Sequence, residues 1–188
     1  DGDRCLAVDE NGNEIDGDKL LAIISNSLRK KGKLNKDTIV ATVMSNLGLN
    51  KYARDNGLEL LQTKVGDRYV LEEMLKDGFN LGGEQSGHVI LLDYNPTGDG
   101  ILTSLMLIQA ILEEDKKASE LGSMVKLYPQ VLINAKVNAD KKYDYEKDDT
   151  IKEAIEKLEK EFAGNGRVLI RPSGTEPLVR VMIEGEDQ

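Results

Sequence analysis

A short segment near the carboxyl end concentrates the donors that a phosphate monoester needs. Residues 171–177 read Arg-Pro-Ser-Gly-Thr-Glu-Pro. Arginine presents a planar set of N–H donors to phosphate oxygens, hydroxyl side chains add further donors, and glycine lets backbone N–H groups approach an anion. The whole chain has a net charge of -9, so this attraction for phosphate must be local. The candidate phosphate-binding residues are Arg171, Ser173, Gly174, Thr175 and Arg180.

A glycine-rich segment at 82–88 has the composition of a sugar site. It reads Gly-Gly-Glu-Gln-Ser-Gly-His. Sugar hydroxyls both donate and accept hydrogen bonds, so Glu84 can accept from two neighbouring hydroxyls while Ser86 donates or accepts beside it. His88, the only histidine, is either a structural residue or a group that assists the chemistry, and both interpretations stay open. Together with the arginine segment, these residues predict a phosphorylated sugar as the ligand.

A pair of aspartates opens the sequence. Asp1 and Asp3 are separated by one glycine and followed by Arg4, so both carboxylates can turn toward one hard cation such as Mg²⁺. The alternative is a frayed polar end, because disorder concentrates at termini.

A further acidic residue lies where a glycine turn leads into a predicted helix. The segment 65–69 reads Val-Gly-Asp-Arg-Tyr. Asp67 either caps that helix or binds a ligand, with Arg68 beside it, and neither interpretation is preferred.

The composition is typical of a globular protein and disfavours several other classes of protein. The 188 residues are 39% hydrophobic and 31% charged, as in an ordinary globular protein, and no apolar stretch approaches the roughly 20 residues that span a bilayer. The acidic balance disfavours a nucleic-acid or anionic-membrane binder, which needs a basic stripe. A single cysteine, Cys5, excludes an internal disulfide and is predicted to be a buried strand residue in the apolar run 5–8. We therefore expect a cytoplasmic protein.

Predicted strands and helices alternate up to residue 127. The run 38–44 is rich in β-branched residues and almost wholly apolar, as in a parallel strand covered on both faces. The helix 101–112 is apolar on more than one face, so we expect it to pack centrally. Alternation of this kind predicts an α/β layered domain with a mainly parallel sheet. The other predicted elements are strands 5–8, 58–63 and 88–93 and helices 20–28, 49–56 and 68–76.

A different pattern follows a charged, irregular stretch at 113–127, where we place a domain boundary. Residues 131–137 alternate apolar and polar side chains, which indicates a strand with one exposed face. The remaining elements complete a small α+β domain at 128–188 with an antiparallel sheet. The charged run 140–149 predicts a solvated loop. The elements beyond that loop are a helix at 151–162 and strands at 167–170 and 178–183.

In their order along the chain, these motifs resemble those of the α-D-phosphohexomutases. Residues 1–4 resemble the end of that family's metal-binding Asp-Gly-Asp-Gly-Asp-Arg loop, 83–88 resemble its sugar-binding loop, and 171–177 resemble its phosphate-binding loop. The likeness covers essentially the whole chain and implies the last half of a four-domain enzyme. On this basis the chain divides into the end of the preceding domain with the remnant of the metal loop, a third, sugar-binding domain and a fourth, phosphate-binding domain, at 1–14, 15–127 and 128–188.

The resemblance implies an isomerase that moves phosphate from a serine of the first domain to the sugar, through a 1,6-bisphosphate that reorients before it returns phosphate to the serine. Mg²⁺ and a glucosamine or glucose 1,6-bisphosphate are the implied cofactors. No residue of this chain corresponds to the phosphoserine, so we expect the chain alone to be inactive and to hold Mg²⁺ poorly. The implied substrate-binding residues are Glu84, Ser86, Asp67, Arg68, Arg171, Ser173, Gly174, Thr175 and Arg180, the metal ligands are Asp1 and Asp3, and the assisting residues are His88 and Arg4.

The residues Gln85 and 65–69 favour the branch of the family that interconverts glucosamine-6-phosphate and glucosamine-1-phosphate for peptidoglycan precursors. The implied partners are a phosphorylated amino sugar, the missing N-terminal domains and, in the full-length protein, a second copy of itself. Three alternatives stay open: a phosphoglucomutase or phosphomannomutase, a non-catalytic module that binds sugar phosphates, and a scaffold whose loops are ordinary turns.

Overall fold

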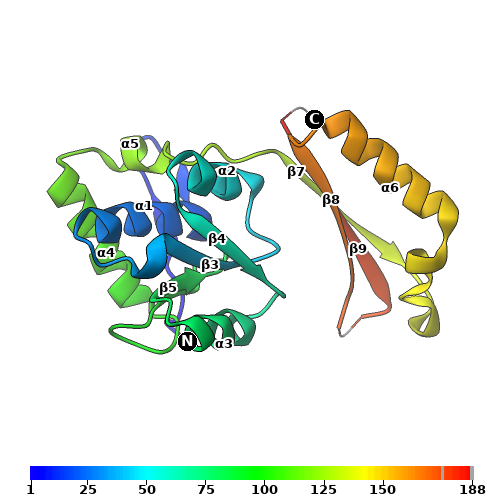
Figure 1. Cartoon of the computed structure of the whole chain (residues 1–188), viewed down its shortest axis with the longest axis horizontal. Helices are drawn as coiled ribbons and strands as arrows, with labels where there is room; N and C mark the ends of the chain where they lie inside the picture. The colour runs from blue at the N-terminus through cyan, green and yellow to red at the C-terminus, as the bar shows by residue number, and fades with distance from the viewer. Residues whose placement is uncertain (175, 187–188) are drawn as a thin grey trace. The chain divides into compact units, whose positions relative to one another are not determined.

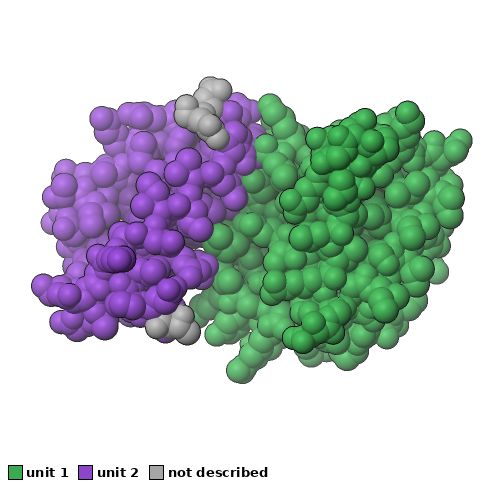
Figure 2. All heavy atoms as spheres, turned by 180° about the vertical axis from the view of Figure 1, so that it is seen from behind, with its two compact units in different colours: residues 1–127 green, residues 128–188 purple. Residues whose placement is uncertain are grey.

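The chain forms two compact units, Asp1–Leu127 and Tyr128–Gln188, which Figure 2 distinguishes by colour. The structure is a computed structural model that describes residues 1–174 and 176–186. Each unit has its own sheet, and Figure 1 labels most of the elements. Within the described residues, no helix has both the length and the apolar character that crossing a membrane requires.

A four-stranded sheet in the order β4-β3-β5-β6 lies at the centre of the first unit (Figure 1). β3 (Thr38–Thr42), β4 (Glu59–Thr63) and β5 (Leu81–Gly83) run parallel, and β6 (Val89–Leu91) is antiparallel to β5. Every residue of β3 is buried, because a parallel strand between two helical layers has no face toward water. The predicted α/β class with a mainly parallel sheet is therefore confirmed.

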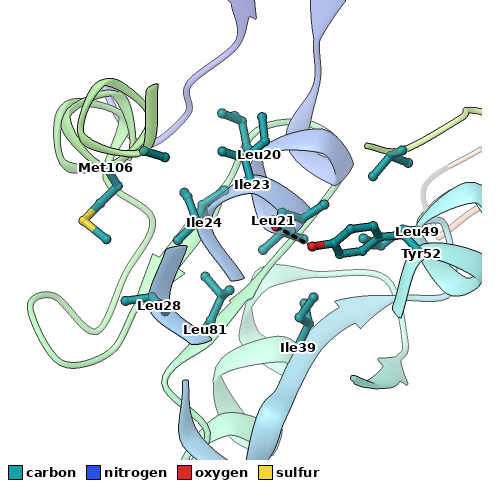
Figure 3. Close-up of a cluster of buried hydrophobic side chains, with 14 of the residues drawn as sticks. Leu20, Leu21, Ile23, Ile24, Leu28, Ile39, Leu49, Tyr52, Leu81 and Met106 are labelled. Carbon is teal, nitrogen blue, oxygen red and sulfur yellow. Dashed lines mark hydrogen bonds between the residues drawn. The ribbon is translucent and has the colours of Figure 1, made fainter. Parts of the chain in front are cut away.

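Helices cover both faces of this sheet. α1 (Gly17–Lys30) and α2 (Leu47–Asp55) share one core cluster with Ile39, and α3 (Asp67–Asp77) shares a second cluster with Val40. Neighbouring residues of β3 thus serve opposite layers, as the alternation of side chains along a strand requires. The first cluster, shown in Figure 3, includes Leu20, Leu21, Ile24, Leu28, Leu49, Tyr52 and Leu81.

The boundaries of α1 follow local signals in its sequence. Asp16 precedes the helix, and its Oδ1 accepts a hydrogen bond from the Lys19 N–H at 3.0 Å. Arg29 and Lys30 lie in the last turn, where positive charge suits the helix dipole. Inside the core, the Tyr52 hydroxyl donates to the Ala22 carbonyl at 3.2 Å, so this phenol is buried without losing its hydrogen bond (Figure 3).

α4 (Gly100–Glu114) packs beside α1 and is followed by α5 (Ala118–Gly122). Met106 and Leu107 of α4 enter the same core cluster as α1. The opposite face of α4 is exposed, so the prediction that this helix packs centrally is wrong. The sequence shows two apolar faces, but only one of them meets a neighbour within this unit.

A short hairpin precedes α1. It consists of β1 (Ala7–Val8) paired antiparallel with β2 (Glu14–Ile15). Cys5 lies before β1 and is only half-buried, so the prediction of a buried strand cysteine is wrong. Partial burial nevertheless raises the pKa of its thiol, which disfavours the reactive thiolate.

The second unit is a three-stranded antiparallel sheet with one long helix. The sheet order is β7-β9-β8, from β7 (Gln130–Lys136), β8 (Gly166–Pro172) and β9 (Leu178–Gly185), and the helix is α6 (Asp149–Phe162). This confirms the predicted small antiparallel sheet. Short 3-10 helices occur at Asn35–Asp37, Ala139–Lys141 and Asp144–Lys147.

A buried ion pair ties the strands of this second sheet together. Arg167 Nε lies 2.7 Å from Glu184 Oε2, and the Glu184 side chain is 0% exposed. Gln130 Nε2 donates to the other Glu184 oxygen at 2.8 Å. One carboxylate thus joins side chains from all three strands, and such a buried charge is tolerated because its partners satisfy it.

Candidate sugar-phosphate site

The predicted sugar loop is a closed turn between β5 and β6. The Glu84 N–H donates to the His88 carbonyl at 2.9 Å, and the Gly87 N–H donates to the Glu84 carbonyl at 3.0 Å. Gly87 has a φ of +90°, a conformation that other residues rarely adopt. On the outside of the turn, the Gly17 N–H at the start of α1 donates to the Gln85 carbonyl at 3.0 Å. The backbone therefore holds this loop rigidly.

The loop that follows β4 lies beside this turn. Gly66, which precedes α3, donates its N–H to Glu84 Oε1 at 3.2 Å. Parallel strands bring their carboxyl ends to one edge of a sheet, and this edge is where α/β folds place ligands. Within the described residues Glu84 Oε2 makes no hydrogen bond, so one carboxylate oxygen is fixed and the other can accept from a ligand.

His88 connects three separate segments of the first unit. Its side chain is 6% exposed; Nδ1 lies 3.2 Å from Asp3 Oδ2, and Nε2 accepts from the Gly98 N–H at 3.2 Å. A backbone N–H can only donate, so Nε2 is the acceptor, and the proton of the neutral ring belongs on Nδ1, where it donates to Asp3. Both ring nitrogens are therefore occupied, which is the arrangement of a positioning residue.

The backbone at Gly98 comes unusually close to this imidazole. A Cβ at position 98 would lie 2.5 Å from His88 Cε1, well inside van der Waals contact. Only glycine lets the chain pass here and donate its N–H to the ring. Gly98 is thus part of the candidate site, and the sequence analysis did not single it out.

The two predicted metal ligands stand on a fixed segment of backbone. The Gly100 N–H donates to the Gly2 carbonyl at 2.8 Å, and the Cys5 N–H donates to the Gly87 carbonyl at 3.0 Å. The pKa of the Asp3 carboxyl is lowered, first by its own backbone N–H and then by the hydrogen bond from His88. The carboxylate form is therefore favoured in the folded state.

Asp1 and Asp3 alone do not fit a magnesium site. Mg²⁺ requires about six oxygen ligands in near-octahedral geometry, and one oxygen of Asp3 is already engaged by His88. No group of three or more His, Cys, Asp or Glu side chains suited to a metal occurs in the part of the chain that the structure describes. Further ligands must come from outside these residues if a cation binds.

Other predicted residues differ in their relation to the sugar loop. Asp67 is the first residue of α3, where its Oδ1 accepts from the Arg68 N–H at 2.8 Å, and its Oδ2 lies 3.9 Å from His88 Nε2. Arg68 Nε donates instead to Glu72 at 2.7 Å, along the helix. The Arg4 side chain is exposed and makes no hydrogen bond or ion pair within 1–174 and 176–186. The structure thus brings Asp67 to the site and gives Arg68 and Arg4 no contact with it.

Two polar atoms of the sugar loop have no partner among the described residues. Ser86 Oγ and Gln85 Oε1 are shielded from water and make no hydrogen bond there. An unpaired buried polar group costs about 1–3 kcal/mol, so such groups gain from an added partner. A ligand hydroxyl or amine is one such partner.

The arginines of the phosphate motif face each other in the second sheet. Arg171 of β8 and Arg180 of β9 are directly paired in register. Burial and then the neighbouring charge of Arg180 lower the pKa of Arg171, so the two cations repel each other in a partly dry environment. Glu176 Oε2, at 3.3 Å from Arg180 Nη2, offsets only part of this charge. An anion between the two guanidinium groups is therefore favoured.

The turn between β8 and β9 carries the remaining residues that were predicted to bind phosphate. The Ser173 N–H donates to the Leu178 carbonyl at 2.9 Å, and Ser173 Oγ accepts from the Glu176 N–H at 3.2 Å. The hydroxyl proton of Ser173 thus stays available for a ligand. Gly174 is exposed, and apart from its chain neighbours no described residue has an atom within 4 Å of its Cβ position. Thr175 lies outside the described residues.

The structure adds a third cation to this turn. Lys142 Nζ donates to the Ser173 carbonyl at 2.8 Å. Lys142 belongs to the run 140–149 that was predicted to be a solvated loop, and no local signal distinguishes it from the neighbouring lysine. Its contribution depends on a contact between residues 31 positions apart.

Comparisons with known proteins agree with this arrangement. Residues 16–128 match the family model described as phosphoglucomutase/phosphomannomutase, alpha/beta/alpha domain III, and residues 132–188 match that of the C-terminal domain. The phosphoglucosamine mutase of Ruminiclostridium cellulolyticum is 61% identical over 188 residues, which are 100% of this chain and 42% of that protein. That of Caldicellulosiruptor saccharolyticus is 60% identical over 187 residues, again 100% of this chain and 42% of the relative.

Solved structures show the same fold. An N-acetylglucosamine-phosphate mutase in its product complex has a TM-score of 0.79 at 22% identity and is matched over 100% of this chain and 44% of its own. The Aspergillus fumigatus N-acetylphosphoglucosamine mutase in complex with GlcNAc-6P and magnesium has a TM-score of 0.75 at 23% identity, over 100% of this chain and 47% of its own. The chain spans less than half the length of these proteins, and the two family-model matches show that it belongs to the phosphoglucomutase/phosphomannomutase family.

Proposed function

We propose that this chain supplies the sugar- and phosphate-recognition residues of a phosphoglucosamine mutase, which interconverts glucosamine-6-phosphate and glucosamine-1-phosphate. The observation that carries the proposal is the identity of about 60% to proteins of that name over the whole chain. The site geometry supports it independently, because one unit presents acceptors suited to a sugar and the other presents paired cations suited to a phosphate.

The sugar is held by Glu84 and Ser86 in this proposal. Glu84 enters the site with one oxygen already fixed by the Gly66 N–H, so little side-chain entropy is lost when the other oxygen accepts a ring hydroxyl. Ser86 Oγ gains the partner that the described residues do not provide. The amino group of glucosamine is a hydrogen-bond donor, and the unpaired Gln85 Oε1 is an acceptor for it. A neutral amide oxygen discriminates between an amine and a hydroxyl less strongly than a carboxylate would.

The phosphate that is not transferred is held by Arg171, Ser173 and Arg180. A phosphate monoester placed between the guanidinium groups replaces their mutual repulsion with two sets of charge-assisted hydrogen bonds. Lys142 fixes the carbonyl of Ser173 and adds positive charge beside it. These residues bind and orient the substrate, and none of them is positioned as a nucleophile.

The proposed function also requires a reacting serine and further metal ligands that lie outside this chain. The reacting serine, which is phosphorylated in the working enzyme, belongs to the part of the protein that precedes this chain. Mg²⁺ would be bound by Asp1 and Asp3 together with ligands from that part, and it would neutralise the phosphate in transfer. A cytoplasmic location, a homodimer and a role in supplying amino-sugar phosphate for peptidoglycan precursors complete the proposal.

A mutase assay on the full-length protein tests the substrate directly. The protein is supplied with glucosamine-6-phosphate and a trace of a hexose 1,6-bisphosphate, and glucosamine-1-phosphate is measured by phosphorus NMR. Turnover of glucosamine-6-phosphate in clear preference to glucose and mannose phosphates is the expected result. Turnover confined to glucose or mannose phosphates would assign the protein to another branch of the same family.

A further inference from the structure

The outer face of α4 carries a continuous stripe of exposed apolar side chains. Ile101, Leu105, Ile108 and Leu112 are 75%, 58%, 51% and 75% exposed. Their spacing of four, three and four residues places all of them on one side of an α-helix. This α4 stripe lies opposite the face through which the helix joins the core of the first unit.

A stripe of this kind is unusual on a helix face that is in contact with water. The outer face of α3 carries Glu72, Glu73 and Lys76, and its two exposed large apolar residues, Tyr69 and Leu75, are six positions apart and form no row. Scattered apolar residues need no explanation, but a contiguous row on one helix marks a surface that another part of a protein covers. The α4 stripe therefore indicates an interface.

The path of the chain points to what covers it. The Gly2 carbonyl accepts a hydrogen bond from the Gly100 N–H at 2.8 Å, so the first residues of the chain lie against the first turn of α4. Polypeptide that precedes Asp1 therefore joins the first unit at the end of the helix where Ile101 begins the stripe. A domain that is joined at this point begins next to the first residue of the stripe.

The comparison with the family indicates that a domain precedes the first unit in the full-length polypeptide. The matched model numbers the first unit as domain III of a series, and the chain spans only 42% of its R. cellulolyticum relative. We propose that the α4 stripe is the docking surface for the α/β domain that immediately precedes domain III in the full-length polypeptide. The inference concerns the assembly of the protein and does not depend on which sugar it binds.

Thiol labelling of the full-length protein tests this assignment with a matched control. Leu105→Cys places a thiol on the stripe, and Leu75→Cys places one on α3, where the exposed fraction is 61% against 58% for Leu105. Each thiol is labelled with N-ethylmaleimide, and its peptide is followed by mass spectrometry, with rates divided by those in guanidinium chloride. Leu75 lies near the end of its helix, where the dipole disfavours a thiolate, which biases the comparison against the expected result.

The expected result is labelling at position 105 that is slower than at position 75 by on the order of tenfold or more, since a covered thiol reacts only through local opening. Ile108→Cys provides a second probe of the stripe if Leu105→Cys fails to fold. Equal rates at the stripe and at position 75 would overturn the proposal. Protection that disappears on dilution of the protein would also overturn it, because a second copy would then be the cover.

Discussion

At the scale of single residues, side chains of the candidate sugar loop are already held by contacts within the first unit. Glu84 is fixed by Gly66, and His88 is fixed by Asp3 and Gly98. Side chains that are already ordered lose little entropy when a ligand binds, so their contacts contribute more of their energy to recognition.

Arg171→Ala in the full-length protein should reduce kcat/KM for the sugar phosphate by roughly tenfold to a hundredfold, the effect of losing a charged hydrogen bond worth about 1.5–3 kcal/mol. Arg171→Lys should fall between this variant and the natural protein, because lysine keeps the charge and loses the planar fork. Steady-state assays measure both. A near-normal specificity constant for Arg171→Ala, with Lys141→Ala as the surface control, would remove this residue from the site.

Gly98→Ala should displace the His88 ring, because the added Cβ would lie 2.5 Å from Cε1. We expect a loss of about 1–3 kcal/mol in the free energy of unfolding, as is typical of overpacking. Gly122→Ala is the matched control, since its Cβ would meet Ile15 at an ordinary 3.4 Å. Denaturant unfolding measures both variants.

The double variant His88→Ala, Gly98→Ala separates this clash from a general effect of alanine. Removing the ring removes the obstacle, so the double variant should lose less stability than the sum of the two single changes. Additive losses would show that Gly98 acts independently of His88.

At the scale of elements, the two sheets are stabilised in different ways. The first sheet is covered on both faces and β3 is entirely buried, whereas the three strands of the second sheet share the buried Glu184 carboxylate. The strongest effects of substitution should therefore arise from volume changes in the first sheet and from charge changes in the second.

Arg167→Ala should lower the free energy of unfolding of the second unit by about 3 kcal/mol, because it removes the cation that lies 2.7 Å from a fully buried carboxylate. Lys160→Ala, which removes a cation from an exposed pair with Glu156, should cost less than about 0.5 kcal/mol. Chemical denaturation followed by the tyrosines of the second unit distinguishes the two. Equal losses would contradict the assignment of a structural role to the buried pair.

Acid should weaken the first unit partly through Asp99, the residue that caps α4. The pKa of Asp99 is lowered by the Leu102 N–H and then by the Asn95 side chain. At pH values between the folded and the unfolded pKa of Asp99, the unfolded chain binds more protons than the folded chain. The contribution of Asp99 to the free energy of unfolding is therefore fully present above the unfolded pKa of about 3.9 and is lost as the pH falls through the folded pKa.

Asp99→Asn isolates this contribution, because asparagine also caps helices but does not titrate. The variant should lose less stability than the natural protein when the pH is lowered from 7 to 3. Denaturation midpoints at several pH values provide the measurement, and parallel losses in the two proteins would exclude Asp99 as a source of acid sensitivity.

At the scale of the whole molecule, the proposed function assigns recognition and reaction to different parts of a longer protein. The 188-residue chain should show no mutase turnover. It should also bind glucosamine-6-phosphate only weakly, because the proposed function divides the ligand contacts between this chain and the part of the protein that precedes it. Calorimetry of the isolated chain and turnover assays on both proteins check this. Measurable turnover by the isolated chain would show that a nucleophile lies within it.

The sequence predicted the elements whose signals are local. The run around Ile39 and Val40 reads as a strand covered on both faces, and it is one. β5 was missed because Leu81–Gly83 contains two glycines and no β-branched residue, although it lies at the centre of the sheet. Glycine is needed there, since a Cβ at Gly82 would lie 2.8 Å from a Val70 methyl group of α3. The second apolar face of α4 was visible in the sequence but was assigned to the core.

The sequence alone determined the chemical inventory of this protein: an acid and a hydroxyl in a glycine-rich turn, two arginines around a second turn, and an alternation of strands and helices. These features follow from residue types and short spacings, which do not depend on the path of the chain. Only the tertiary structure decided that His88 donates to Asp3, 85 residues away, and that Lys142 reaches Ser173, 31 residues away. Such contacts depend on how strands pair and helices pack, and these long-range arrangements are set by the burial of the whole core.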